Sequence, residues 1–423
     1  MRIRLDRQFA ILLVASSVAV SLSARAQDAG VANATTSRAQ AIADAEQEKA
    51  KHLTPQKPPR GERKFDHYEK DILGPIFNTN GPALKFGGIP TGGGFSLGPQ
   101  YTRQGLFADH LTTNLYVAGS TRKWYGGAAS LDFHDLANGH LELRADGGYQ
   151  NSASVWYFGE GADSSKSNKT DFDREFTTAH LSLLSHLCDQ KLTVGYTVGG
   201  LLVHVGPGDL SGTPTTQALF TGADTPGLTQ QSNFVTGTTT VQLNFSHLGF
   251  SNPEGLQIEA DDSQFFDQSA NQANFHLLAT QAAYYLPLTN GMRTLVFRVR
   301  NETAFAEDNQ IVPFYLQPTL GGPDDLRGYD RYRFYGNGVS VASGEYRWSI
   351  SQMIEMAVFG EGGNVYQRPG LIGIRDLRGD GGFGLRFKNK QASIMRFDVG
   401  FSPEGVHVWF VFNDIFGKLY RTF

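Results

Sequence analysis

The sequence contains one cysteine, Cys188, so an internal disulfide is excluded. It has no excess of basic charge either, since its net charge is -4, which argues against nucleic acid as the main partner. Beyond residue 22, no apolar run approaches the about 20 residues that a helix needs to cross a membrane. Strands of a barrel face lipid with every second residue only, so the mean hydropathy of -0.30 remains compatible with a membrane protein.

Motifs of enzymatic chemistry are scarce. The sequence has no His-Glu-x-x-His motif and no spaced cluster of Cys and His. The acids Asp163, Asp171, Asp173 and Glu175 lack the spacing of a calcium loop, and a solvated outer loop explains them better. We therefore predict a protein that is not an enzyme and that holds no metal and no cofactor.

The N-terminus has the features of a secretory signal peptide. Three arginines within the first seven residues precede an apolar run, Phe9–Leu22, and Ala24-Arg25-Ala26 has the small-x-small pattern of a cleavage site. The run is too short for a membrane anchor, which is the alternative interpretation. We predict a signal peptide at 1–26 and a mature chain that begins at Gln27.

Residues 27–81 differ from the rest of the chain. They are rich in Ala, Gln, Glu and Lys up to Lys51, and Thr54–Pro59 then contains three prolines. This pattern indicates a short periplasmic arm followed by an extended linker, or simple disorder after cleavage. The remainder, 82–423, is predicted to be one all-β domain.

From about Ala83 onward, strand-like segments alternate with Gly, Asn, Asp and Pro. In Met395–Phe401 and in Leu295–Arg300 the apolar residues fall on one face and the charged residues on the other. A soluble sandwich would alternate as well, so this pattern alone does not decide the fold. We predict about sixteen strands, at roughly 82–91, 93–103, 110–120, 122–135, 139–158, 171–187, 189–206, 233–247, 253–266, 273–287, 291–305, 333–350, 352–366, 377–389, 391–402 and 405–416.

The lengths of the connections favour a transmembrane barrel. Three long connections, at about 159–170, 207–232 and 306–332, all fall at one end, whereas turns such as Leu187-Cys188-Asp189 fall at the other. Long loops outside and short turns inside are typical of outer-membrane barrels. The sheet must close, because an unpaired backbone group in hydrocarbon costs several kcal/mol. We predict a sixteen-stranded antiparallel transmembrane β-barrel in the outer membrane of a Gram-negative bacterium.

Three motifs carry a resemblance to a known family. The third long connection contains Leu326-Arg327-Gly328-Tyr329, and Gly344–Trp348 and Phe359–Gly363 follow it in order. The chain resembles the bacterial surface antigen family, which includes the BamA-like and TamA-like assembly barrels and the two-partner-secretion transporters. The resemblance covers about 82–416. It implies a sixth outer loop that folds back into the lumen and carries the arginine tetrad.

The inward faces of the neighbouring strands offer partners for this arginine. The resemblance implies an inward acid on each of two strands, here Glu345 and Glu361, although the family has Asp where this chain has Glu361. Arg327 could meet either acid in a forked pair, and we hypothesise that this pair locks the loop to the wall. The alternative is a solvated arginine above a wet pore. The supporting residues on the same inward faces are Phe359, Gly363, Gly382 and Gly384.

The resemblance implies protein insertion, assembly or translocation at the outer membrane. Expected partners are outer-membrane lipids and, by resemblance, nascent outer-membrane proteins, secreted proteins or accessory periplasmic proteins. Family members that receive unfolded clients carry periplasmic POTRA domains, and a complete one does not fit in the about 55 residues before the first strand. We therefore expect a short, barrel-only member. The alternatives are a passive channel and a barrel-embedded hydrolase.

Overall fold

The computed structural model describes residues 80–412, apart from 88, 90–92, 249–251, 290–291, 352, 369–376 and 390–391. The predicted signal peptide, its cleavage site and the arm up to residue 79 lie outside the described residues. The described residues belong to one compact unit, Glu69–Phe423. No helix among them is long and apolar enough to cross a membrane.

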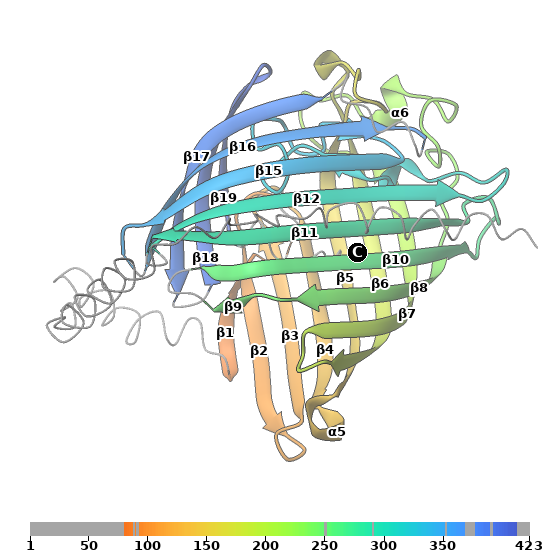
Figure 1. Ribbon diagram of the computed structural model, residues 1–423. Helices are drawn as coiled ribbons and strands as arrows, with labels where there is room; N and C mark the ends of the chain where they lie inside the picture. The colour runs from red at the N-terminus through yellow and green to blue at the C-terminus, as the bar shows by residue number, and fades with distance from the viewer. Residues whose placement is uncertain are drawn as a thin grey trace, which may run out of the picture. The chain divides into compact units, whose positions relative to one another are not determined.

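Sixteen antiparallel strands form one sheet in which each strand pairs with the next long strand along the chain (Figure 1). These strands are β1 (Gly81–Phe86), β2 (Ser96–Leu106), β3 (Leu111–Ser120), β4 (Tyr125–Asp135), β5 (Leu141–Tyr157), β6 (Thr170–Leu187), β7 (Leu192–Pro207), β8 (Phe234–Asn244), β10 (Pro253–Asp267), β11 (Phe275–Thr289), β12 (Arg293–Ala306), β15 (Gly338–Ser349), β16 (Ile354–Tyr366), β17 (Arg378–Asn389), β18 (Ala392–Ser402) and β19 (Gly405–Val411). The predicted all-β class and the strand number are confirmed.

The remaining elements are short and lie in connections. A two-residue strand, β9 (His247–Leu248), pairs with the start of β10, and β13 (Thr319–Leu320) pairs with β14 (Phe334–Tyr335) inside the sixth loop. The single-turn helices are α5 (Leu136–Gly139), α6 (Thr216–Leu219), η2 (Lys166–Asn168) and η3 (Phe314–Leu316).

Several predicted strand boundaries are wrong by three residues or more, among them those of the first and the twelfth strand. The first strand was expected to reach residue 91, but β1 ends at Phe86 because Gly87 has a φ of +76° and turns the chain. The twelfth strand was expected to begin at residue 333, but β15 begins at Gly338. The apolar pair Phe334–Tyr335 belongs to the β13–β14 hairpin instead.

The first and last strands meet through aromatic side chains, and the sheet curves into a barrel (Figure 1). The ring of Phe412, which directly follows β19, lies 5.8 Å from that of Phe86 on β1 and 5.9 Å from that of Phe95. We call this junction the seam. Closure is what the bilayer requires, because hydrocarbon offers no partner to the backbone groups of an open edge.

The two faces of the wall differ as the alternation predicted. On β12, Phe297 and Val299 are exposed on the outer face, whereas Arg298 between them is buried in the interior. On β18, Phe397 is exposed and Arg396 is fully buried. Lipid therefore meets aliphatic and aromatic rows, and charged groups are gathered inside.

Three long connections, 158–169, 208–233 and 307–337, occur at the same end of the barrel. The second and third share an apolar core with the ends of β5 and β6, and the first pairs with Tyr335 of the third through its backbone. The ring of Tyr157 lies 5.2 Å from that of Phe314 and 4.9 Å from that of Tyr335, in edge-to-face geometry. Phe172 packs on Phe314 at 4.8 Å. Such ring pairs each contribute about 0.5–1.5 kcal/mol beyond their burial. We call this packed group of loops the outer dome.

Candidate functional site

The sixth loop, residues 307–337, turns sharply just before the tetrad. Leu326 has a left-handed φ of +53°, which is unfavourable for a residue with a side chain, and the Tyr329 N–H donates to its carbonyl over 3.0 Å. Gly321 and Gly322 also have positive φ values. Backbone strain of this kind is concentrated at functional positions. The turn directs Arg327 into the interior of the barrel.

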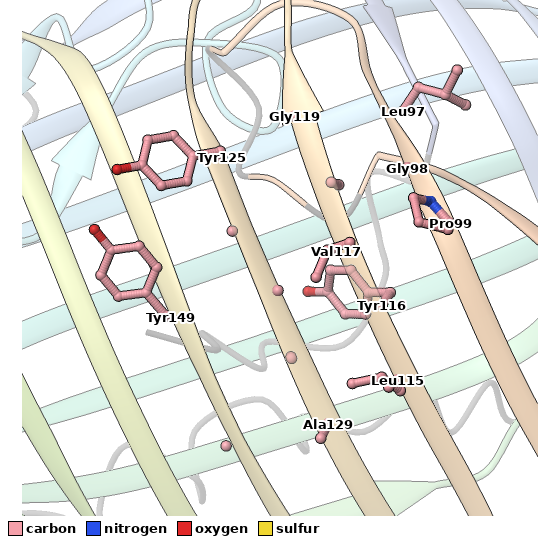
Figure 2. Close-up of a pocket in the computed structure, with 15 residues that line it drawn as sticks. Leu97, Gly98, Pro99, Leu115, Tyr116, Val117, Gly119, Tyr125, Ala129 and Tyr149 are labelled. Atoms are coloured by element: carbon pink, nitrogen blue, oxygen red, sulfur yellow. The ribbon is translucent and has the colours of Figure 1, made fainter.

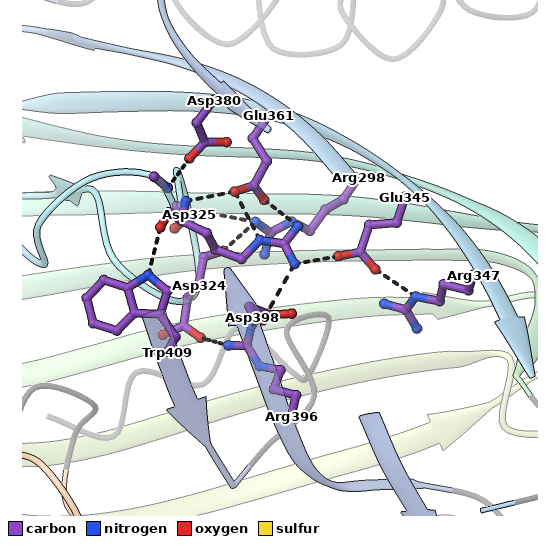
Figure 3. A network of polar contacts seen from close by, with 12 residues as sticks. Arg298, Asp324, Asp325, Glu345, Arg347, Glu361, Asp380, Arg396, Asp398 and Trp409 are labelled. Atoms are coloured by element: carbon purple, nitrogen blue, oxygen red, sulfur yellow. Dashed lines mark hydrogen bonds and ion pairs between the residues drawn. The ribbon is translucent and has the colours of Figure 1, made fainter. Parts of the chain in front are cut away.

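Arg327 contacts two strands of the wall at once, through Glu361 on β16 and Glu345 on β15, both of which are labelled in Figure 3. Its Nε and Nη2 donate to the two carboxylate oxygens of Glu361 on β16 over 3.2 and 3.1 Å, and its backbone N–H donates to the same carboxylate over 2.9 Å. Its Nη1 lies 2.8 Å from Glu345 on β15. The guanidinium carbon lies 3.3 Å from the ring centre of Phe359. The structure thus brings Arg327 together with both acids that the sequence offered.

Arg327 has no exposed surface, so its charge depends on these partners. Burial alone would lower the pKa of the guanidinium, but the carboxylates of Glu361 and Glu345 outweigh burial and raise that pKa above its ordinary value. The arginine is therefore a permanent cation. Removal of one partner from a buried pair leaves the other charge uncompensated.

Glu345 is shared by three guanidinium groups. Besides Arg327, it accepts from Nε of Arg347 on its own strand over 2.7 Å and from Nη2 of Arg386 on β17 over 2.9 Å. All four side chains are almost fully buried. One carboxylate thus holds three cations together, and the loop supplies only one of them.

The rest of the tetrad is fixed by backbone contacts and packing. The Gly328 N–H donates to the carboxylate of Asp380 on β17, and its carbonyl accepts from the hydroxyl of Ser402 on β18. Leu326 and Tyr329 are buried in an apolar cluster that the loop shares with β15 and β16. Every residue of the tetrad therefore contacts the wall or the loop's own core.

The predicted supporting glycines line the path of the loop. A side chain at Gly382 would collide with the ring of Phe359, and one at Gly384 would collide with the carboxylate of Asp398. A Cβ at Gly363 would lie 3.2 Å from a leucine of the sixth loop, which is tighter than most real contacts. The inner faces of β16 and β17 therefore need glycine at these positions.

A fourth glycine, Gly400 on β18, was not singled out from the sequence. A Cβ there would overlap the carbonyl group of Arg327. We expect Gly400→Ala to push the loop from the wall and to destabilise the barrel by about 1–3 kcal/mol, the usual effect of overpacking. The measurement is the temperature at which the heat-modifiable folded band disappears on a gel. Gly360→Ala on β16 is the matched control, because its Cβ would meet only one backbone oxygen, at 4.0 Å; equal shifts in both variants would contradict the steric reading.

Two acids of the loop were also missed. Asp325 lies 2.6 Å from Arg298 and forms a second ion pair with Arg300, both on β12, and Asp324 lies 2.9 Å from Arg396 on β18. The loop therefore contributes anions as well as a cation. The alternation of apolar and charged residues along the strands placed the three arginines on the inner face. Loop residues follow no such alternation, so the sequence alone did not indicate that Asp324 and Asp325 pair with these arginines.

Trp409 on β19 completes the contacts around the tetrad. Its indole N–H donates to the carbonyl of Arg327 over 2.7 Å, and Asp398 on β18 lies 3.7 Å from the guanidinium. Alternation could have found Trp409, because its neighbours Val408 and Phe410 are exposed on the outer face. The loop is thus in contact with all five strands from β15 to β19.

The Omp85 superfamily domain matches residues 148–406, which is more than half of the chain. The chain belongs to the Omp85 superfamily. This Omp85 protein lies in the outer membrane of a Gram-negative bacterium, as its fold and family indicate. The three motifs that carried the resemblance all fall within the matched residues.

Solved structures with the same fold include the crystal structure of BamA from Haemophilus ducreyi lacking POTRA domains 1-3, at 13% identity and a TM-score of 0.58, over 78% of this chain and 69% of that one. CdiB from Escherichia coli is 10% identical with a TM-score of 0.54, over 78% of this chain and 61% of that one. This Omp85 chain thus spans less than two thirds of CdiB. A search of curated protein sequences gave no match.

Proposed function

We propose that this Omp85 barrel inserts or translocates polypeptides at the outer membrane, and that Arg327 holds the sixth loop in the working position. The observation that carries the proposal is the fully buried guanidinium that joins the loop to β15 and β16. Its partners would be nascent outer-membrane or secreted proteins, together with lipids and accessory periplasmic proteins. Membership of the superfamily favours such a role over an enzymatic one.

The loop contacts the strands that lead to the seam. It binds β15 to β19, whereas β1 on the other side of the seam is only six residues long and contains Pro82. A short strand with proline is a poor pairing partner, so its edge is available to a client strand. In our proposal the loop holds the last five strands in place. The short first strand is then the side of the seam that separates to pair with a client strand.

Cross-linking in native membranes tests this role. A photoreactive residue in place of Leu84, which is exposed on the outer face of β1, should give adducts with unfolded or nascent barrel proteins. The same residue in place of Val299, on the outer face of β12, is the control for contact with lipid alone. A third position near Lys51 probes the arm. Equal adducts at Leu84 and Val299 would argue against a client at the seam.

A passive channel is the main alternative, and the structure disfavours it. Arg327, Arg386 and Arg396 inside the barrel have no exposed surface, and the outer dome packs aromatic rings over the end that carries the long loops. In a planar bilayer we expect low and irregular conductance. Steady openings of large conductance would support the channel instead.

A barrel-embedded hydrolase was the second alternative. The stretch Gly94-Phe95-Ser96-Leu97-Gly98 matches the pattern of a nucleophile elbow, which sequence reasoning overlooked. An elbow requires a turn from a strand into a helix, but Ser96 begins the strand β2 and is buried. Among the described residues, no three His, Cys, Asp or Glu side chains are grouped to hold a metal ion.

A further inference from the structure

The outer face of the barrel has a groove across β2, β3, β4 and β5 (Figure 2). Its volume is about 610 Å³, and its lining is almost entirely apolar. The outward residues of its floor are small, namely Gly119, Gly127, Ala129 and Gly147, and its raised edges are Leu97, Leu115, Val117, Tyr125 and Tyr149. Elsewhere on the belt, as on β12, large side chains such as Phe297 fill the corresponding positions.

The width of the groove restricts what fits in it. Between Leu115 on β3 and Tyr149 on β5 the floor spans two interstrand spacings, or about 10 Å, which is wider than a single acyl chain. The floor lies on the lipid-facing side of a membrane barrel, so its occupant comes from the bilayer. Two chains side by side would cover it, and a single-chain lipid would leave glycine backbone exposed.

The outer end of the groove carries hydroxyl groups and then cations. Tyr125 and Tyr149 stand side by side with their ring centres 6.0 Å apart, and the Tyr149 hydroxyl donates to Glu175 on β6. Tyrosine is enriched where acyl chains meet head groups. Arg122 and Lys123 are exposed in the turn just beyond Tyr125, at the end of the barrel that carries the long loops.

The cations at this end lie close to each other. The guanidinium of Arg122 lies 5.2 Å from the ring centre of Trp156, and Nζ of Lys169 lies 3.2 Å from the same ring. Burial, followed by the charges of Arg122 and Lys166, lowers the pKa of Lys169, although Asp330 opposes this. Lys123 has an acidic partner, Asp209, at 2.7 Å, and that pair is exposed. With Glu175 included, the group has four cations, Arg122, Lys123, Lys166 and Lys169, and three acids, Asp209, Asp330 and Glu175, so its net charge is positive and attracts an anion.

We propose that this groove binds a phosphorylated lipid of the outer leaflet that carries several acyl chains. The acyl chains would lie over the glycine floor between Leu115 and Tyr149. The phosphate would lie beyond the two tyrosines, near Arg122 and Lys123. The groove lies on the lipid-facing side of β2 to β5, whereas Arg327 is buried inside the barrel, so this proposal does not rest on the proposed function.

Native mass spectrometry of the purified full chain tests the site, with bisphosphorylated lipid A and phosphatidylethanolamine as the two probes. Wild type should retain one lipid A and little phosphatidylethanolamine. Gly119→Leu fills the floor, and it should fold normally because no heavy atom lies within 4 Å of the added Cβ. We expect it to reduce the bound lipid A about tenfold. Arg122→Gln combined with Lys123→Gln should abolish the preference between the two lipids.

Gly200→Leu is the matched control. Gly200 lies between the exposed residues Val198 and Leu202 on β7, and its Cβ would meet only one backbone oxygen, at 3.9 Å. It should retain lipid A as wild type does, and heat-modifiability should show that both glycine variants fold. Equal retention by Gly119→Leu and Gly200→Leu would mean an adventitious lipid only and would overturn the site. Equal binding of the two lipids to wild type would overturn the recognition of phosphate.

Discussion

Replacing Arg327 with alanine is expected to reduce sharply the amount of folded barrel in the membrane. The change leaves Glu361 buried without its cation, and it removes a hydrogen-bonded fork with Nε–Oε2 and Nη2–Oε1 distances of 3.2 and 3.1 Å. Breaking a buried pair in this way costs about 3–5 kcal/mol. The measurement is the fraction of heat-modifiable barrel in outer-membrane preparations, together with the urea midpoint of the barrel refolded in detergent.

Two further variants distinguish the contribution of the positive charge at position 327 from that of the forked guanidinium geometry. Arg327→Lys keeps the cation but loses the fork, so its folded fraction should be intermediate. Arg327→Ala combined with Glu361→Gln should recover part of the lost stability, because the neutral amide needs no cation. Arg103→Ala, an exposed arginine on β2, is the control. Wild-type amounts of folded barrel and wild-type function in Arg327→Ala would contradict the proposal that Arg327 holds the sixth loop in its working position.

Much of the fold was predictable because the alternation of apolar and polar residues along a strand can be recognised within a few residues. Each strand shows its lipid face and its inner face within a few residues, as Phe297, Arg298 and Val299 do. The same rule agrees with the inward orientation of Glu345 and Glu361 that the resemblance implied. The ends of strands were harder, because Phe334–Tyr335 has the composition of a strand and pairs within the loop instead.

The site was predictable only in part, for a different reason. The resemblance supplied Arg327 and the two inward acids, Glu345 and Glu361, but the choice between the acids stayed open because they lie on adjacent strands. The structure shows contacts to both, since a guanidinium has enough donors to serve two carboxylates. Asp324 and Asp325 could not be assigned, because their partners are far away in sequence and loops have no period.

The distribution of charge also distinguishes the two acids that bind Arg327. Glu361 binds Arg327 through three hydrogen bonds, from the backbone and from two guanidinium nitrogens. Glu345 on β15 instead binds both the loop and the wall, because Arg347 on β15 and Arg386 on β17 contact it as well as Arg327. Loss of Glu361 therefore affects mainly the loop, whereas loss of Glu345 affects the wall as well.

For that reason Glu345→Gln is expected to be at least as harmful as Arg327→Ala, although it changes fewer atoms. The amide keeps the size of the side chain, but three buried guanidinium groups lose the carboxylate that they share. Urea midpoints and heat-modifiability are the measurements. Glu355→Gln is the matched control, because this buried acid on β16 forms an ion pair with one cation, Lys388.

The ranking of these two glutamate variants is the test. Glu345→Gln should lower the folded fraction well beyond Glu355→Gln, and the additional change Arg347→Gln should restore part of the loss, because it removes one of the three crowded cations. Glu345 lies on the wall and the change leaves the loop sequence intact, so a large effect would show that the loop and the wall share one charge network. If Glu355→Gln proves equally harmful, or if Arg347→Gln brings no recovery, repulsion among the three guanidinium groups is not what Glu345 relieves.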